Sequence, residues 1–113
     1  MKLVALTAIA FASSASAQSS TVFAPTRSGQ TIVCADYNSG SELLKLAVDN
    51  WVVGYFSGIN VGVKAQGGTN FQTGENTTAS GLVGEFKLIC ATNPSNPISL
   101  AAAKLYAKMS PAK

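Results

Sequence analysis

The chain of 113 residues contains no histidine, and only 12% of its residues are charged. Histidine is the commonest general base and a frequent metal ligand, so its absence removes the usual basis for acid–base catalysis and for a two-cysteine, two-histidine zinc site. The five acidic residues lack the spacing of a glycosidase carboxylate pair. A Ser-Lys dyad stays open, because both residue types are frequent. We predict a non-enzymatic protein with no catalytic residue, metal site or cofactor.

Positive charge is scarce and dispersed as well. Eight Lys/Arg stand against five Asp/Glu, and no basic cluster occurs along the chain. Proteins that bind nucleic acid or anionic lipid carry such clusters. The sequence therefore predicts a protein partner and no nucleic acid.

The first 17 residues have the parts of a secretory signal peptide. Lys2 gives a positive start, residues 3–12 form an uncharged apolar run, and small residues lead to Ala17. The alternatives are a membrane anchor, which needs about 20 apolar residues, and a buried helix. We predict cleavage after Ala17, a periplasmic or secreted location, and no integral membrane segment in the mature chain.

Residues 18–30 are rich in Ser, Thr, Pro and Gly. We expect them to form a flexible N-terminal arm before one helical domain over 31–113.

Only two cysteines occur, Cys34 and Cys90. Export leads to an oxidising compartment, so we expect them to form a disulfide, with two free thiols as the alternative. In the chain-entropy model a bridge across this separation adds about 4 kcal/mol to the free energy of unfolding. For a domain with one small core, that contribution is large.

Apolar residues recur at three- to four-residue spacing over about 41–61, which predicts a main helix with Ser41 as its N-cap. A second helix is expected from about Thr78–Ser80 to Asn93-Pro94, and a third from Ser99 to Pro111. The predicted fold class is all-α, a small bundle of three to four helices stapled by one disulfide. Expected core residues are Leu44, Val48, Trp51, Tyr55 and Ile59 in the main helix, Leu82, Val83, Phe86, Ile89 and Cys90 in the second, and Leu100, Ala103 and Tyr106 in the third, with Leu105 and Met109 as further candidates.

Gly54, Gly58 and Gly62 form one row on the main helix. Each glycine inside a helix costs up to about 1 kcal/mol relative to alanine, so the row needs an explanation. We interpret it as a face against which another segment of the same chain packs. A groove that accepts a partner is an alternative, and a transmembrane dimer motif is a third that Asp49-Asn50 disfavours.

Four aromatic residues lie in or near the main helix. Trp51 and Tyr55 are predicted to fill the core, although aromatic side chains also contribute strongly to protein interfaces. Phe56 lies off the predicted core face, so Phe56 and Tyr37 are the candidate partner contacts.

The chain resembles the HdeA/HdeB-type periplasmic family in three segments: Val33-Cys34-Ala35-Asp36-Tyr37, residues 51–58 and Cys90-Ala91-Thr92-Asn93-Pro94. The similarity covers about Thr31 to Met109. The resemblance implies an all-helical fold with one disulfide and an acid-stress chaperone whose dimer opens at low pH to expose apolar surface to unfolding clients. Members are dense in Lys, Asp and Glu, whereas this chain is not, so its sparse titrating groups predict a weak response to acid.

The segment Gly54-Tyr55-Phe56-Ser57-Gly58 is similar to a helix segment of the Rap1a/Tai-type immunity proteins, which are also exported, helical and disulfide-bonded. This resemblance implies tight binding of one folded toxin enzyme at neutral pH, with Phe56 and the loop over 64–77 as the contact surface. The partners predicted from the two resemblances are thus unfolded clients, one folded toxin, or a second copy in a homodimer.

Overall fold

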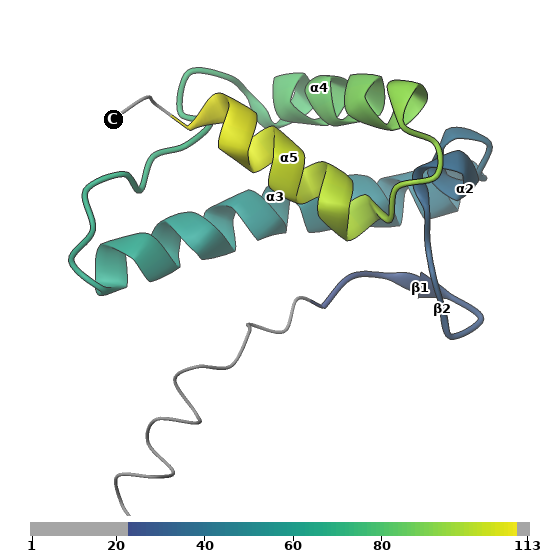
Figure 1. Cartoon of the computed structure of the whole chain (residues 1–113), viewed down its shortest axis with the longest axis horizontal. Helices are drawn as coiled ribbons and strands as arrows, with labels where there is room; N and C mark the ends of the chain where they lie inside the picture. Colours follow the sequence, from purple (N-terminus) through teal and green to yellow (C-terminus); the bar gives the residue numbers. More distant parts are fainter. Residues whose placement is uncertain (1–22, 111–113) are drawn as a thin grey trace, which may run out of the picture.

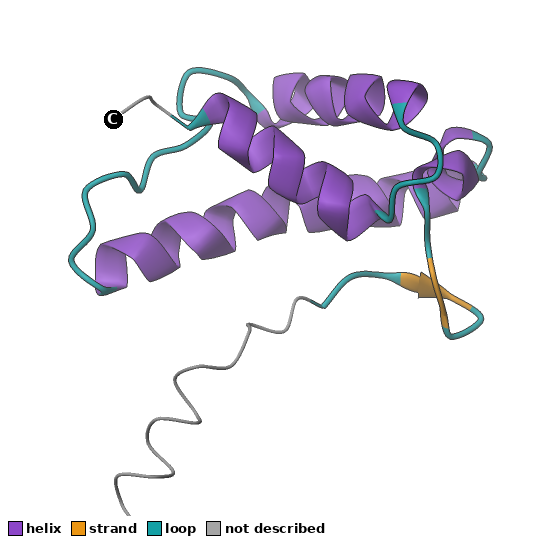
Figure 2. Cartoon of the chain, in the orientation of Figure 1, coloured by secondary structure: helices purple, strands orange, loops and turns teal. Residues whose placement is uncertain are grey.

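The computed structural model describes residues 23–110, which form four helices and one small hairpin (Figure 1, Figure 2). In order, the elements are β1 (Thr26–Arg27), β2 (Gln30–Thr31), α2 (Cys34–Asn38), α3 (Glu42–Ala65), α4 (Ala79–Thr92) and α5 (Ile98–Met109). A mostly helical bundle with one disulfide is confirmed. The predicted signal peptide, its cleavage site and the stop at Pro111 lie outside the described residues. No helix over 23–110 is long and apolar enough to cross a membrane.

The longest helix, α3, runs along one side of the molecule, and α4 and α5 both pack on it (Figure 1). It begins where the Ser41 hydroxyl accepts a hydrogen bond from the backbone N–H of Leu44. It ends before Gly67, whose φ of +82° allows the Gly68 N–H to bond back to the Val63 carbonyl at 2.9 Å. The predicted Ser41 cap is therefore confirmed.

The core face of α3 differs from the predicted one. Its buried residues are Val48, Val52 and Phe56. Trp51, Tyr55 and Ile59 are only partly buried, as is Leu44. Val48 was expected in the core and is buried, but beyond it the observed positions 52 and 56 are offset by one from the predicted positions 51 and 55, which rotates the face by about 100°. The packing of α4 and α5 against the Val52 and Phe56 side decides between them.

The predicted cap and core residues agree with the structure better for α4 than for α5. Thr78 caps α4, and its buried residues Leu82, Phe86 and Cys90 were all expected in the core. Pro97, not Ser99, is the N-cap of α5. The predicted core residues Leu100 and Ala103 are exposed and Tyr106 is partly buried. The buried residues of α5 are Ile98, Ala101, Ala102 and Leu105.

The disulfide between Cys34 and Cys90 is confirmed and is fully buried. It joins the start of α2 to the last turn of α4. The connection is reinforced by backbone hydrogen bonds from the Cys34 N–H to the Asn96 carbonyl and from the Ala35 N–H to the Pro94 carbonyl, both 2.8 Å. Most of residues 35–40 belong to α2, where the Asp36 carboxylate accepts a hydrogen bond from the Val33 N–H at 3.1 Å.

The end of the predicted N-terminal arm is ordered by a hairpin rather than flexible throughout. Thr26 pairs with Thr31 and Arg27 with Gln30, joined by Ser28 and Gly29, both with positive φ. Such a two-residue turn matches the twist of the strands. Upstream, the Phe23 carbonyl accepts a hydrogen bond from the Trp51 indole N–H at 2.6 Å, which attaches the arm to α3.

Candidate functional site

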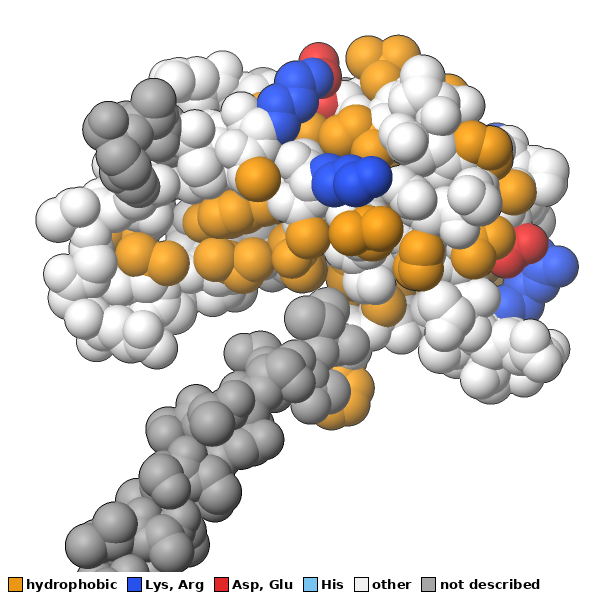
Figure 3. Space-filling view, in the orientation of Figure 1, with side chains coloured by type: hydrophobic (Ala, Val, Ile, Leu, Met, Phe, Trp, Pro, Cys, Tyr) orange, Lys and Arg blue, Asp and Glu red, His pale blue; other side chains and the backbone are white. Residues whose placement is uncertain are grey.

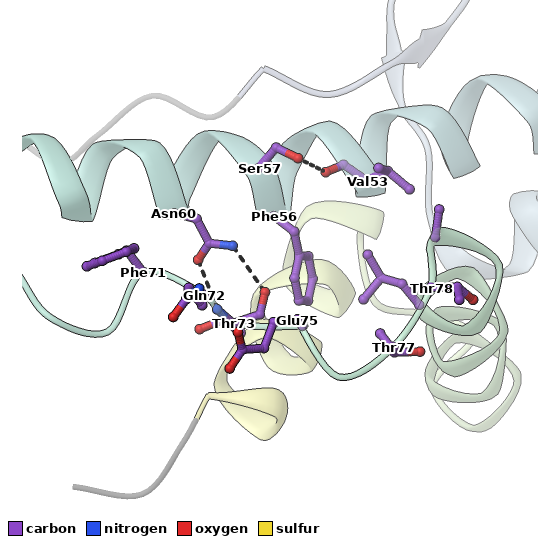
Figure 4. Close-up of a pocket in the computed structure, with 13 residues that line it drawn as sticks. Val53, Phe56, Ser57, Asn60, Phe71, Gln72, Thr73, Glu75, Thr77 and Thr78 are labelled. Atoms are coloured by element: carbon purple, nitrogen blue, oxygen red, sulfur yellow. Dashed lines mark hydrogen bonds between the residues drawn. The ribbon is translucent and has the colours of Figure 1, made fainter.

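A hollow of about 360 Å³ opens between the middle of α3, the loop over 66–78 and the first turn of α4 (Figure 4). Its size falls within the range of small ligand sites and of pockets that accept a partner's side chain. It is lined by Val53, Phe56, Ser57, Asn60, Phe71, Gln72, Thr73, Gly74, Glu75, Thr77, Thr78, Ala79 and Leu82.

The floor of this hollow is apolar. Phe56 and Leu82 belong to the core, with 3% and 5% of their surface exposed. Gly74 lies directly over the Phe56 ring with a φ of +90°, and a Cβ at this position would come within 3.3 Å of that ring. Glycine is therefore favoured where the loop crosses Phe56, because the backbone angle is strained for other residues and a Cβ would press on the ring.

The loop over 66–78 is held to α3 mainly by the Asn60 side chain. The Asn60 amide donates to the Thr73 carbonyl at 3.1 Å and accepts from the Thr73 N–H at 3.3 Å (Figure 4). The Tyr106 hydroxyl donates to the same Asn60 oxygen at 2.6 Å, and the Thr73 and Ser110 hydroxyls lie 3.2 Å apart. One amide thus connects α3, the loop and α5, which fixes the shape of the hollow.

The rim is polar and nearly uncharged. Glu75 is the only ionisable residue of the lining, and the Lys64 ammonium, outside the hollow, stacks 5.3 Å from the centre of the Phe71 ring.

A second hollow of about 510 Å³ continues between α3 and α4 toward Asp49 and Lys87 and shares Val53 and Ala79 with the first. We call the two hollows together the α3–α4 groove.

Two tyrosines near the core have raised pKa values. Burial is the main cause for Tyr37, and the Asp49 carboxylate, which accepts its hydroxyl hydrogen bond, adds to the rise in pKa. Burial also raises the pKa of Tyr55, with a further contribution from the nearby Tyr106 hydroxyl. Neither shift creates a general base near neutral pH, because each moves away from it.

The chemistry of the α3–α4 groove suits binding. Its first hollow offers one carboxylate, several hydroxyl and amide groups, and an apolar floor. Among residues 23–110 no three His, Cys, Asp or Glu side chains are grouped as metal ligands would be. Such a lining can accept an apolar side chain and hydrogen-bond its surroundings.

The predicted partner contacts are wrong in detail. Phe56 is buried and touches the α3–α4 groove only as its floor. Tyr37 is 1% exposed and packs edge-on against Phe86, 5.2 Å between ring centres. The predicted core aromatics Trp51 and Tyr55 pack against each other on the flank of α3 and are partly buried.

The internal packing predicted for the glycine row is also wrong. Gly54 and Gly58 are exposed, and a Cβ built on Gly54, Gly58 or Gly62 would meet no atom of another segment within 4 Å. The row faces outward, away from the core face of α3.

The residues that shape the site, Asn60, Thr73 and Gly74, were not singled out from the sequence. An asparagine among apolar helix positions and a glycine in a long polar loop are the only signals present there. Neither signal indicates that the two segments meet.

Comparisons with protein families, curated proteins and solved structures find no match to this chain. Its class is therefore defined by its own geometry. Residues 23–110 form a small disulfide-linked helical domain with an open groove, whose first hollow is nearly uncharged.

Proposed function

We propose that this chain is an exported, non-enzymatic binding protein that holds one folded protein partner in the α3–α4 groove. This is the role implied by the resemblance to Rap1a/Tai-type immunity proteins. The observation that carries the proposal is the loop fixed by Asn60 over an apolar floor. A surface already held in its binding conformation loses little conformational entropy on association, which favours a tight complex with a partner of matching shape.

The polarity of the groove indicates how the partner is recognised. The floor of Phe56 and Leu82 suits an apolar side chain inserted from the partner, and the threonine-rich rim suits hydrogen bonds around it. Glu75 is the only ionisable residue that lines the first hollow. Charged side chains are also sparse on the side of the molecule where α5 lies in front (Figure 3). We therefore expect binding to depend little on salt and to occur at neutral pH.

A blocked groove tests this proposal. Ala79 is exposed and lines both hollows, whereas Ala91, also exposed and on the same helix, lines neither. The protein captured from periplasmic extract at pH 7 would be identified, purified and titrated by calorimetry. We expect Ala79→Trp to weaken binding at least about tenfold and Ala91→Trp to leave it unchanged. Equal affinities for the two variants would refute the groove as the contact surface.

The acid-stress chaperone is the second candidate function. It is favoured by the exposed large apolar side chains Leu43, Leu46, Val61 and Leu88, because a chaperone binds unfolding clients through apolar surface.

Light scattering of an acid-labile client distinguishes the two functions. Without Lys2 the mature chain has seven Lys/Arg and five Asp/Glu, so its net charge rises only from +2 to +7 when all carboxylates are protonated. We expect little suppression of client aggregation near pH 2. Strong suppression at that pH, absent at pH 7, would establish the chaperone instead.

A further inference from the structure

The outer face of α3, opposite the core face, is uncovered by any other described residue. Leu43 and Val61 have 76% and 68% of their surface exposed. At helical spacing the face also contains Ala47, Gly54, Gly58 and Ala65, all exposed, while Leu46 lies on its flank at the same helical angle as Lys64. No charged residue lies on this face, although α3 spans about 36 Å. An uncharged face of this length with large apolar residues is typical of an interaction surface.

We propose that this outer face binds the same face of a second copy, with the two α3 helices antiparallel. Along the centre of the face, Leu43 and Val61 are large side chains, and Ala47, Gly54 and Ala65 are small ones. If Gly54 of one copy faces Gly54 of the other, Leu43 falls opposite Ala65 and Val61 opposite Ala47. Each copy then supplies both the projections and the spaces that receive them, as a two-fold interface requires.

Charge supports the same arrangement. Glu42 lies in the first turn of α3 and Lys64 in the last, both exposed on the same flank of the outer face. Antiparallel pairing brings Glu42 of each copy near Lys64 of the other, at both ends of the interface. A parallel pairing would instead place like charges together. Antiparallel helix dipoles favour the same orientation.

The glycines make the close approach feasible. A Cβ at Gly54 or Gly58 would contact no other segment of the chain, so the backbone itself forms the surface there. Helices that meet through glycine can approach closer than the usual 8–10 Å between axes. One helix face is smaller than the roughly 800 Å² per partner of a standard interface, so we expect association in the micromolar range.

Sedimentation over a concentration series tests the proposal. We expect the wild-type mature protein to change from one to two copies as its concentration rises, and Gly54→Leu to raise the dissociation constant at least about tenfold. Gly84→Leu is the matched control, because Gly84 is an exposed helical glycine with equally open space, on α4. A wild-type protein that stays monomeric throughout, or equal association of both glycine variants, would overturn the proposal.

Two further measurements test the orientation. Glu42→Lys and Lys64→Glu should each weaken association, and the double variant should restore it. A short bifunctional maleimide should cross-link Gly54→Cys to its own counterpart but not Leu43→Cys, whose counterpart lies about 33 Å away along the helix. Cross-linking of Leu43→Cys to itself would show a parallel pair.

Ala79→Trp should sediment like the wild type, so failure of the groove proposal leaves the dimer proposal separately testable.

Discussion

At the residue scale, Asn60 has the largest influence on the candidate site. Its amide satisfies the backbone of Thr73 in both directions and accepts from the Tyr106 hydroxyl. We expect Asn60→Ala to lower the free energy of unfolding by about 1–3 kcal/mol, because it leaves partly buried polar groups without partners. Urea unfolding followed by circular dichroism measures this change.

The control for Asn60 is on the same helix. Asn50 is exposed, so Asn50→Ala should change stability by less than about 0.5 kcal/mol. Hydrogen exchange adds a local readout, since the Thr73 amide should exchange faster in Asn60→Ala. Unchanged exchange at Thr73 would contradict the role of Asn60 in fixing the loop.

Tyr37 predicts how stability depends on alkaline pH. Its pKa is higher in the folded protein than in the unfolded chain because it is buried and bonded to Asp49. The stabilisation is therefore complete below the unfolded pKa of about 10 and is lost as the pH rises above it.

Urea unfolding at several pH values tests this dependence. Between about pH 10 and 12 the free energy of unfolding should fall more steeply for the wild type than for Tyr37→Phe. Lysines titrate in the same range but are present in both proteins, so the difference isolates Tyr37. Parallel profiles would contradict the burial of its hydroxyl.

At the scale of the element, the exposed glycines of α3 lower its helical stability without any internal packing in return. Gly54→Ala and Gly58→Ala should each raise the free energy of unfolding of the monomer by about 0.5–1 kcal/mol. Measurements at low protein concentration avoid any contribution from self-association. Gly40→Ala should have the opposite effect, because its Cβ would come within 2.8 Å of the Asp36 carbonyl oxygen. A stability loss in the first two variants would mean that this face packs internally after all.

Features that depend on local sequence were predictable, and features that depend on tertiary packing were not. The Ser41 and Thr78 caps and the core side of α4 were predictable, because they depend on residues within one or two turns. The face of α3 was not. Val52 and Phe56 repeat with the same period as Trp51 and Tyr55, and only the position of α4 and α5 selects between them.

The candidate site was predictable only in part for the same reason. The long polar loop after α3 was recognised from its composition. Its attachment to Asn60 was not, since a side-chain hydrogen bond between segments 13 residues apart leaves no periodic signal. The short helix α2 was missed because five residues show too little periodicity, and the disulfide and the loop before α5 hold it in place.

At the scale of the whole molecule, the disulfide joins the two ends of the helical core. Cys34 and Cys90 enclose α3 and nearly all of α4. Reduction should lower the free energy of unfolding by about 4 kcal/mol, because the unfolded chain regains the freedom that the closed loop removed. Thermal unfolding with and without reductant measures the effect. A Cys34→Ala/Cys90→Ala variant, which has no bridge to reduce, is the control, and its midpoint should not respond to reductant. Equal midpoints for oxidised and reduced wild type would contradict a structural role for the bridge.

The attachment of the N-terminal arm to Trp51 also has an optical consequence. Trp51 is the only tryptophan in the chain, and its indole N–H donates to the Phe23 carbonyl. Its fluorescence therefore comes from a single site at the junction of arm and helix. If the Phe23 carbonyl is released, water should replace it at the indole N–H, and we expect the emission to move to longer wavelengths. The protein thus contains its own spectroscopic probe of arm release, readable without any label.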